Sequence, residues 1–382
     1  MHIALLVPTL DRIAGAERQV TLLAKGLKRR NHRVSVLTLS GTGGEAYQEL
    51  MALGIGFISL GMRKGLADPR GWFRMRRWIL KEAPDVLHAH LPHAAWMARW
   101  SRLITHVPVV VDSIHTTATG TIGRRLGYRL SDRFPDAVTA VSQSVADAYL
   151  CAGMVSAKHL HIVPNGVEWV QRQVCPETRD RVRSERRCED TFLWLAAGRL
   201  ETVKDYPTLL RAFALLSRRA HLLIAGSGSL EAALRQLAIE LEIQARVQFL
   251  GFLPDLSRVM QAADAFVLSS LWEGLPMALL EASVHSLPAV ATAVPGSRDA
   301  VMHERTGLLA LPQNPSTLAA AMARLMEMTA EDRATMGAAA HRRITDHFTL
   351  DRVLDRWEEL YRELLDAVRK PSHQNCRHEP AV

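Results

Sequence analysis

Phe192-Leu-Trp-Leu-Ala196 is a run of uncharged apolar residues, and Ala197-Gly-Arg-Leu-Glu-Thr-Val-Lys-Asp205 follows it directly. The length and composition of the run predict a buried strand. Arg199 and Lys204 are therefore expected on the loop that leaves the carboxyl end of that strand, and ligands of open α/β sheets bind outside this edge. Because arginine presents a planar fork to phosphate oxygens and lysine adds a point charge, the pair predicts a phosphate-binding loop.

Two carboxylates flank a later segment, Glu273-Gly-Leu-Pro-Met-Ala-Leu-Leu-Glu281. Pro276 suits the first position of a helix, so we expect a helix to begin there, with Glu273 at its mouth and Glu281 inside it. Gly274 is expected to let a ligand approach the backbone closely. Free N–H groups at the helix start, near Gly274 and Leu275, favour an anion such as a diphosphate. The two carboxylates could then accept hydrogen bonds from sugar hydroxyls.

The alternation of strands and helices continues on both sides of these segments. Apolar periodicity predicts a helix over Glu17–Arg30, and a polar stretch, Gln171–Asp190, is interpreted as a linker between two series of elements. Alternating β and α elements imply parallel, doubly wound sheets, so we predict an α/β fold with two Rossmann-like domains facing a cleft. The predicted strands are 3–7, 33–38, 85–87, 107–112 and 137–141, then 192–196, 221–225, 247–250, 265–268 and 289–292.

Composition narrows the class of protein. The chain has 382 residues, and 48% of them are hydrophobic, which suits two domains with real cores. The first ten residues read as a strand without a basic leader, and no uncharged apolar run of about 18 residues occurs, so neither a signal peptide nor a membrane span is expected. The four cysteines lack CxxC spacing. Reduced thiols and a cytoplasmic location are the simplest expectation.

Charge is distributed unevenly along the chain. Residues 1–165 hold 21 Lys/Arg against 11 Asp/Glu, a net of +10, whereas residues 166–382 hold 26 against 28, a net of −2. An anionic partner is expected for the first half: a phospholipid surface, a diphosphate-bearing substrate or nucleic acid. A basic aromatic segment is either a solvated helix with a core face or an interfacial membrane contact. It comprises Arg70, Trp72, Phe73, Arg74, Arg76, Arg77 and Trp78, with Arg124, Arg125, Arg129 and Arg133 as a possible second basic face.

Together these motifs resemble the donor site of retaining glycosyltransferases of the GT-B fold, family 4 (glycosyl transferases group 1). The resemblance covers nearly the whole chain and rests on the order of its segments. Ala14 stands where the family commonly has glycine. The further matching segments are Ala14-Gly-Ala-Glu-Arg18, Asp85-Val-Leu-His-Ala-His90, Val163-Pro-Asn-Gly-Val167 and Ala225-Gly-Ser-Gly-Ser229.

The resemblance implies transfer of a sugar from a nucleotide-diphosphate donor, UDP-linked, to a saccharide or lipid-linked acceptor in cell-surface polysaccharide or glycolipid synthesis. No metal and no other cofactor is implied. The implied catalytic residues are His115, Glu273, Arg199 and Lys204, with His115 contacting the transferred sugar or acceptor. The implied donor-binding residues are Gly15, Arg199, Lys204, Gly274, Leu275 and Glu281, with Glu281 on the ribose. A peripheral position on the inner face of the cell membrane suits a lipid-linked acceptor.

The resemblance also sets the expected domain limits. Residues 1–168 form an acceptor domain and residues 190–349 a donor domain, while a last helix over 350–368 crosses back to the first domain. The polar tail, Pro371–Val382, is expected to be disordered.

Rival interpretations remain open at this stage. A nucleotide-sugar 2-epimerase has the same fold and needs no acceptor. A nucleic-acid-binding protein is suggested only by the basic half and lacks a recognised binding module. His88, His90 and His93 could form a metal site, although cysteine and paired acidic ligands are missing. His90 is a second candidate for the active site, and Asn165-Gly166 is interpreted as a turn at the domain junction.

Overall fold

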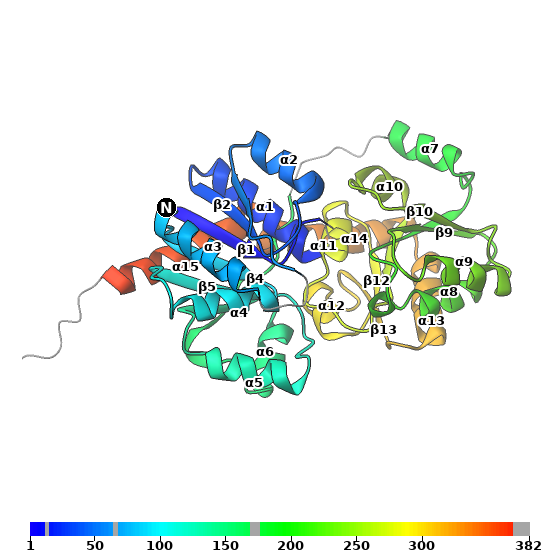
Figure 1. Cartoon of the computed structure of the whole chain (residues 1–382). Coiled ribbons are helices and arrows are strands. Elements are labelled where there is room, and N and C mark those ends of the chain that lie inside the picture. Colours follow the sequence, from blue (N-terminus) through cyan, green and yellow to red (C-terminus); the bar gives the residue numbers. More distant parts are fainter. Residues whose placement is uncertain (12–14, 64–67, 169–175, 370–382) are drawn as a thin grey trace, which may run out of the picture.

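The structure is a computed structural model that describes residues 1–11, 15–63, 68–168 and 176–369. Ala14 and the tail Pro371–Val382 lie outside these residues, so the expectations about them are not addressed. Two parallel sheets, each covered by helices on both faces, lie one after the other along the chain (Figure 1). This is the predicted α/β architecture of two doubly wound sheets.

The first sheet has seven parallel strands in the order β3-β2-β1-β4-β5-β6-β7. The order reverses between β1 and β4, and ligands of doubly wound sheets bind at such a point. Its strands are β1 (His2–Val7), β2 (Arg33–Thr38), β3 (Gly56–Ser59), β4 (Val86–His90), β5 (Val109–Ile114), β6 (Ala137–Ala140) and β7 (Leu160–Ile162). Its helices are α1 (Gly15–Arg29), α2 (Gly44–Ala52), α3 (Pro69–Glu82), α4 (Pro92–Ser101), α5 (Ile122–Ser131) and α6 (Gln143–Cys151).

The second sheet has six parallel strands in the order β10-β9-β8-β11-β12-β13, with the reversal between β8 and β11. Its strands are β8 (Phe192–Ala197), β9 (Ala220–Ala225), β10 (Val247–Gly251), β11 (Ala265–Leu268), β12 (Ala289–Thr292) and β13 (Gly307–Ala310). The helices of this half are α7 (Pro176–Glu185), α8 (Tyr206–Ala214), α9 (Glu231–Glu240), α10 (Ser257–Ala262), α11 (Met277–Val284), α12 (Pro295–Ala300), α13 (Pro315–Glu327), α14 (Ala330–His347) and α15 (Leu350–Arg369).

Alternation along β1 explains why both faces of the first sheet are buried. Ile3, Leu5 and Val7 pack with α1, α2 and α15 on one face, whereas Ala4 and Leu6 pack with α3 and α4 on the other. Successive strand residues point to opposite faces, so a strand covered on both sides must be apolar throughout. The continuous apolar runs that predicted these strands have this origin.

Helix α15 returns to the first sheet, as expected for the last helix. Backbone hydrogen bonds join the two crossing segments: Val167 N donates to Phe348 O at 2.9 Å, and Leu350 N donates to Val167 O at 2.8 Å. Beyond this point Trp357 and Tyr361 are buried against the first sheet. The domain limits at residues 168, 190 and 349 stay predictions, but the chain crosses between the sheets where they place the junction.

Three strands of the structure, β3, β7 and β13, were not predicted from the sequence. β3 reads Gly-Phe-Ile-Ser and its residues are half-buried or exposed. β7 has three residues at the edge of its sheet, two of them exposed. β13 is a four-residue edge strand. β3 and β7 therefore lack the continuous apolar run that marks a central parallel strand. β13 is mostly buried and is as long as the predicted strand β12, so uneven burial does not explain why it was missed.

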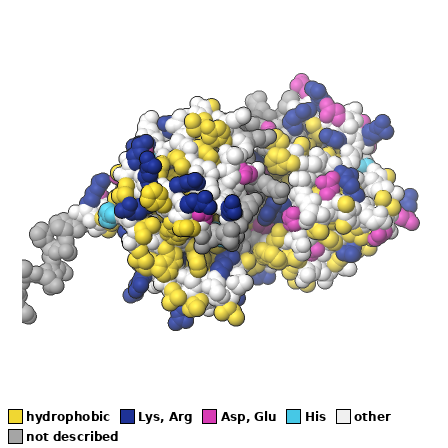
Figure 2. Space-filling model, in the orientation of Figure 1, with side chains coloured by type: hydrophobic (Ala, Val, Ile, Leu, Met, Phe, Trp, Pro, Cys, Tyr) yellow, Lys and Arg dark blue, Asp and Glu magenta, His cyan; other side chains and the backbone are white. Residues whose placement is uncertain are grey.

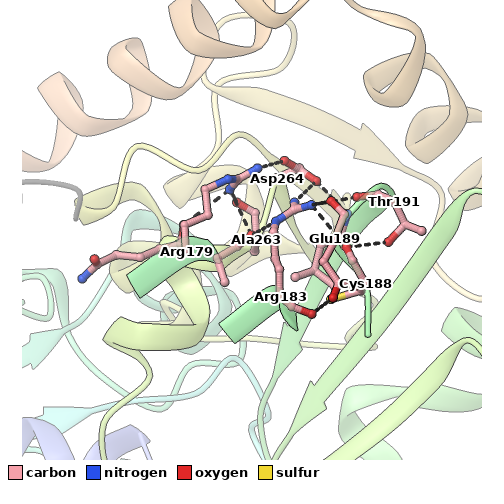
Figure 3. A network of polar contacts seen from close by, with 10 residues as sticks. Arg179, Arg183, Cys188, Glu189, Thr191, Ala263 and Asp264 are labelled. Atoms are coloured by element: carbon pink, nitrogen blue, oxygen red, sulfur yellow. Dashed lines mark hydrogen bonds and ion pairs between the residues drawn. The ribbon is translucent and has the colours of Figure 1, made fainter. Parts of the chain in front are cut away.

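The interpretation of Gln171–Asp190 as a linker is wrong for its described part. Residues 176–185 form helix α7, which is fixed to the second sheet through two arginines (Figure 3). Arg179 and Arg183 each place an Nη2 atom 2.5 Å from one carboxylate oxygen of Asp264. Arg183 also donates to the carbonyls of Ala262, Glu189 and Thr191. The guanidinium groups of Arg179 and Arg183, which suggested a solvated linker, are instead bonded to main-chain carbonyl oxygens and to the carboxylate of Asp264.

The tryptophans of the basic aromatic segment lie on the core side of α3. Trp72 and Trp78 are half-buried and pack against the core beneath this helix, as in the interpretation of the segment as a solvated helix with a core face. Phe73 of the same helix is 64% exposed, and contact of the segment with a membrane stays a prediction. No helix among the described residues is long and apolar enough to cross a bilayer.

Candidate active site

The candidate residues gather where the carboxyl ends of β8 and β11 face those of β4 and β5. Arg199 and Lys204 follow β8, and Glu273 follows β11, the two strands that flank the reversal of the second sheet. His115 directly follows β5 of the first sheet. The structure therefore brings together, from two sheets, four residues that the sequence predicts as catalytic.

The loop after β8 is held against the loop after β11. A short helical turn, Thr202–Lys204, carries Lys204, and Ser269 Oγ donates to the Lys204 carbonyl at 2.7 Å. A Cβ on Gly198 would lie 3.1 Å from Lys204 Cε, so glycine at this position lets the lysine side chain cross the loop. The position of Lys204 is thus set by the backbone around it.

Lys204 and Glu273 form an ion pair. Lys204 Nζ lies 2.5 Å from Glu273 Oε1, and Ser270 Oγ donates to the same oxygen at 2.6 Å. Both charged side chains are mostly shielded from solvent, with 16% and 13% exposed. Arg199, in contrast, is exposed, and its guanidinium makes no hydrogen bond or ion pair within the described part of the chain. Arg199 is therefore an exposed cation on the loop after β8, whereas Lys204 is paired with Glu273.

Gly274 is required for a reason other than the predicted one. A Cβ on Gly274 would lie 2.1 Å from the His115 carbonyl oxygen, so the space beside this glycine is filled by the loop after β5. The expectation that this open side admits a ligand is wrong, and a donor contact from its main chain stays a prediction. The close approach is what places Glu273 next to the His115 loop.

Three successive carbonyls fasten the Glu273–Leu275 segment to the first half. Thr117 Oγ1 donates to the Glu273 carbonyl at 3.3 Å, Ser142 Oγ to the Gly274 carbonyl at 2.8 Å, and Asn165 Nδ2 to the Leu275 carbonyl at 3.0 Å. Asn165 was interpreted as a turn residue only. Its amide is also a bridge between the two halves.

The helix that follows begins one residue later than predicted. Pro276 has an extended backbone at the cap position, and α11 starts at Met277. Gly15, the first residue of α1, faces this start: a Cβ on Gly15 would lie 3.8 Å from Met277 Cγ. Two helix N-termini, one from each half, therefore lie close together at the site, and helix N-termini favour anions.

Glu281 receives a partner that sequence reasoning missed. Arg18 Nε from α1 lies 3.2 Å from Glu281 Oε1. Burial raises the pKa of the Glu281 carboxyl, while the Arg18 charge opposes that rise. Arg18 is the last residue of the Ala14–Arg18 motif, and this motif was the one sequence feature that pointed to it. The contact with Glu281 was not predicted because the two residues are far apart along the chain.

His115 is paired with His90 in a buried environment. His90 Nδ1 and His115 Nε2 are 3.0 Å apart, so one ring donates to the other. Burial lowers the pKa of His115 to about 4, and burial together with the neighbouring imidazoles lowers the pKa of His90 well below its usual value. Both rings are neutral at pH 7. His90 Nε2 and His115 Nδ1 are buried without a hydrogen-bond partner among the described residues.

The three histidines of the first sheet do not converge on one point. His88 uses both ring nitrogens, one with Tyr361 Oη and one with Ser113 Oγ, each at 2.7 Å. His93 is exposed. Across the described ranges, no three His, Cys, Asp or Glu side chains are grouped to hold a metal ion. The absence of a metal from the reaction stays a prediction.

The buried imidazoles predict acid sensitivity of the fold. Because the pKa of His115 is about 4 in the folded chain and its ordinary value is 6.5, the unfolded chain binds a proton between these values that the folded chain does not. The free energy of unfolding should fall as pH drops through 6.5. At pH 5.5 the protonation of His115 in the unfolded chain should account for about 1 kcal/mol of that loss. Urea unfolding of wild type and His115→Asn at pH 7.5 and 5.5 measures this contribution. An identical drop in both proteins would contradict it.

Comparisons with known proteins agree with the geometry. Glycosyltransferase Family 4 matches residues 13–168, and Glycosyl transferases group 1 matches residues 178–343. The chain is 23% identical over 318 residues to the UDP-Gal:alpha-D-GlcNAc-diphosphoundecaprenol alpha-1,3-galactosyltransferase of Escherichia coli, covering 78% of this chain and 81% of the relative. It is 27% identical over 359 residues to the GDP-mannose-dependent alpha-(1-6)-phosphatidylinositol monomannoside mannosyltransferase of Mycobacterium tuberculosis, covering 89% and 90%.

The fold is also that of solved glycosyltransferase structures. Anabaena HepE in complex with UDP-glucose superposes with a TM-score of 0.85 at 21% identity, covering 94% of this chain and 99% of that chain. WaaG, a glycosyltransferase involved in lipopolysaccharide biosynthesis, superposes with a TM-score of 0.71 at 16% identity, covering 94% and 99%. The chain belongs to the family 4, group 1 glycosyltransferases and has the GT-B fold.

Proposed function

We propose that this glycosyltransferase moves a sugar, with retention of anomeric configuration, from a UDP-sugar to a lipid-linked saccharide in cell-surface polysaccharide or glycolipid synthesis. The observation that carries the proposal is the convergence of Lys204, Glu273 and the His115 loop between the two sheets. Lys204 pairs with Glu273 at 2.5 Å, and the His115 carbonyl packs against Gly274. The loops that carry a lysine–carboxylate ion pair therefore pack against the loop that carries a neutral imidazole.

The proposed chemistry needs stabilisation of the leaving diphosphate. As the bond between the anomeric carbon and the diphosphate oxygen breaks, negative charge accumulates on that oxygen. We assign the stabilisation of this charge to Arg199, Lys204 and the N–H groups at the start of α11, because preorganised donors stabilise developing charge effectively in a partly dry site. The acceptor hydroxyl attacks on the same face, and its proton passes to the leaving phosphate oxygen.

The proposed donor and acceptor rest on the relatives. The Escherichia coli relative takes UDP-Gal and a diphosphoundecaprenol-linked acceptor, and the mycobacterial relative takes GDP-mannose and a phosphatidylinositol mannoside. Both acceptors carry a lipid. The net charge of +10 over residues 1–165 suits an acceptor that bears a diphosphate.

Product analysis tests this proposal. The protein is incubated with UDP-sugars and GDP-sugars, with and without a short-chain diphosphate-linked saccharide acceptor, and products are identified by mass spectrometry and proton NMR. We expect a glycosylated acceptor whose new linkage keeps the donor's anomeric configuration. Turnover of the donor sugar without acceptor, yielding its 2-epimer, would replace the proposal by an epimerase. An inverted linkage would overturn retention.

Activity is expected to survive excess EDTA. Lys204, Arg199 and the helix starts supply the positive potential that a divalent cation supplies in other phosphate-transfer sites. Initial rates with EDTA and with added Mg²⁺ or Mn²⁺ should therefore agree within about twofold. Abolition by the chelator and rescue by one of these metals would contradict a metal-independent mechanism.

A further inference from the structure

Helix α5 turns a line of apolar side chains toward solvent. Ile122 is 83% exposed, Leu126 54% and Leu130 59%. These residues are spaced by four, so they form one stripe along the helix surface. Single exposed apolar residues are common on protein surfaces, but three large aliphatic side chains in one line are not explained by chance exposure.

An arginine stripe runs beside the apolar one. Arg125 and Arg129 lie on α5 with the same spacing of four, Arg133 follows in the turn after the helix ends at Ser131, and all three are exposed. From residue 86 to residue 131 the one carboxyl side chain is Asp112, which is fully buried. Helices α4 and α5 themselves therefore carry no exposed carboxylate. Of the acidic residues that follow α5, Asp132 is bonded to His159 and to the Ser156 N–H, and Asp136 pairs with Arg102. In Figure 2 basic and hydrophobic side chains lie side by side on the N-terminal half, while acidic ones gather mainly on the other half.

The inner face of α5 is fixed, so the stripe cannot turn inward. Arg99 pairs with Asp112 at 2.6 Å, with neither side chain exposed. Arg99 Nη1 also donates to the Tyr128 carbonyl at 3.2 Å and to Ser131 Oγ at 3.1 Å. Tyr128 itself is buried. These contacts hold the C-terminal half of α5 with Ile122, Leu126 and Leu130 pointing outward.

We propose that α5 docks this protein on an anionic phospholipid bilayer. The apolar stripe would lie at the boundary of the acyl chains, and Arg125, Arg129 and Arg133 would meet the lipid phosphates, as in helices that lie in the plane of a membrane interface. Helix α3 adds further exposed basic residues to this half of the chain: Arg70, Arg74, Arg76, Arg77 and Lys81.

Two other occupants fit the stripe less well. A symmetric contact with a second copy would pair the same surface with itself and bring like-charged arginine stripes together. Nucleic acid would match the arginines but would leave the aliphatic stripe facing phosphates and water. Only a surface that offers both anionic groups and an apolar interior satisfies both stripes.

The docked orientation places the candidate active site near the membrane. Helix α5 begins at Ile122, directly after the loop that starts at His115. A lipid-linked acceptor could then enter from the surface to which α5 is bound. The docking surface itself does not depend on the proposed reaction, because its test measures binding alone.

Co-sedimentation with vesicles tests the docking surface. The full chain is mixed with vesicles of phosphatidylglycerol and phosphatidylcholine, or of phosphatidylcholine alone, at low and high salt. The stripe variant is Ile122→Ser/Leu126→Ser/Leu130→Ser, and the charge variant is Arg125→Gln/Arg129→Gln/Arg133→Gln. The matched control, Leu215→Ser/Ile239→Ser/Leu311→Ser, removes aliphatic residues that are each more than half exposed in the second half.

Wild type and control should bind the anionic vesicles and not the neutral ones. Each α5 variant should lower the partition coefficient by about tenfold or more. No binding by wild type, or equal binding by wild type and the stripe variant, would overturn the proposal. A dimer in sedimentation velocity that the stripe variant dissociates, without vesicle binding, would assign the surface to a second copy. If the triple stripe variant melts early, Ile122→Ser alone is compared instead.

Discussion

Replacing Lys204 by alanine is expected to lower sugar transfer by a factor on the order of 10²–10³, the usual effect of losing one preorganised electrostatic donor. Lys204 Nζ is 2.5 Å from Glu273 Oε1 and is mostly shielded from solvent, so its charge acts more strongly than a charge in water would. The loss should appear mainly in kcat, because charge on the leaving diphosphate develops as the bond breaks. Initial rates at saturating donor measure the effect.

A charge-matched control separates this effect from a general loss of positive charge. Lys158 is exposed on the turn Ala157–His159 beside β7, away from the donor loop. Lys158→Ala should transfer sugar at the wild-type rate. Turnover of a folded Lys204→Ala variant within a few-fold of wild type would remove Lys204 from the catalytic machinery and leave its ion pair with Glu273 a structural contact.

The Gly274→Ala variant is expected to disturb both halves of the site. The new methyl group would lie 2.1 Å from the His115 carbonyl oxygen and 2.7 Å from its carbonyl carbon, and neither main-chain atom can move without displacing the loop. We expect about 1–3 kcal/mol of destabilisation. Because the loops that carry Glu273 and His115 must separate, we also expect transfer to fall about 10²-fold, the effect of a misplacement of about 1 Å.

Gly123 provides the control for this substitution. No atom lies within 4 Å of a Cβ at this position on α5, so Gly123→Ala should leave the melting temperature and the rate of transfer unchanged or slightly improved. Thermal melts and rates are measured for both alanine variants. Normal activity and stability of Gly274→Ala would show that the two loops are not packed as described.

The central strands and the donor loop were predictable because their signals are local. A parallel strand buried on both faces must be apolar throughout, and the residue after it must lie at the sheet edge. That rule placed Arg199, Lys204 and His115 correctly at carboxyl ends of strands. Glu273 was instead expected at the mouth of the helix after Pro276, and the structure places it on the loop between β11 and α11. The resemblance to family 4 agreed with these positions and added the roles, which stay predictions.

The contacts between the halves could not be predicted in the same way. Arg18 reaches Glu281, and the carbonyls of residues 273–275 receive donors from the first half. Contacts between residues so far apart along the chain depend on how the two sheets pack against each other. The residue pattern of either segment alone carries no information about that packing. Helix α7 was misread for a related reason, since the acceptors of Arg183 are mostly main-chain carbonyls, which every residue type carries.

Binding of UDP in the presence of EDTA tests the central claim, a donor site built from Arg199 and Lys204 beside the start of α11. Isothermal titration compares UDP and GDP on wild type and on a folded Arg199→Ala/Lys204→Ala variant. The account predicts one site for a nucleoside diphosphate per chain and at least about a hundredfold loss of affinity in the variant, since two charge-assisted contacts to phosphate are removed. Equal affinity in the two proteins, or no binding of either nucleotide to wild type, would contradict it.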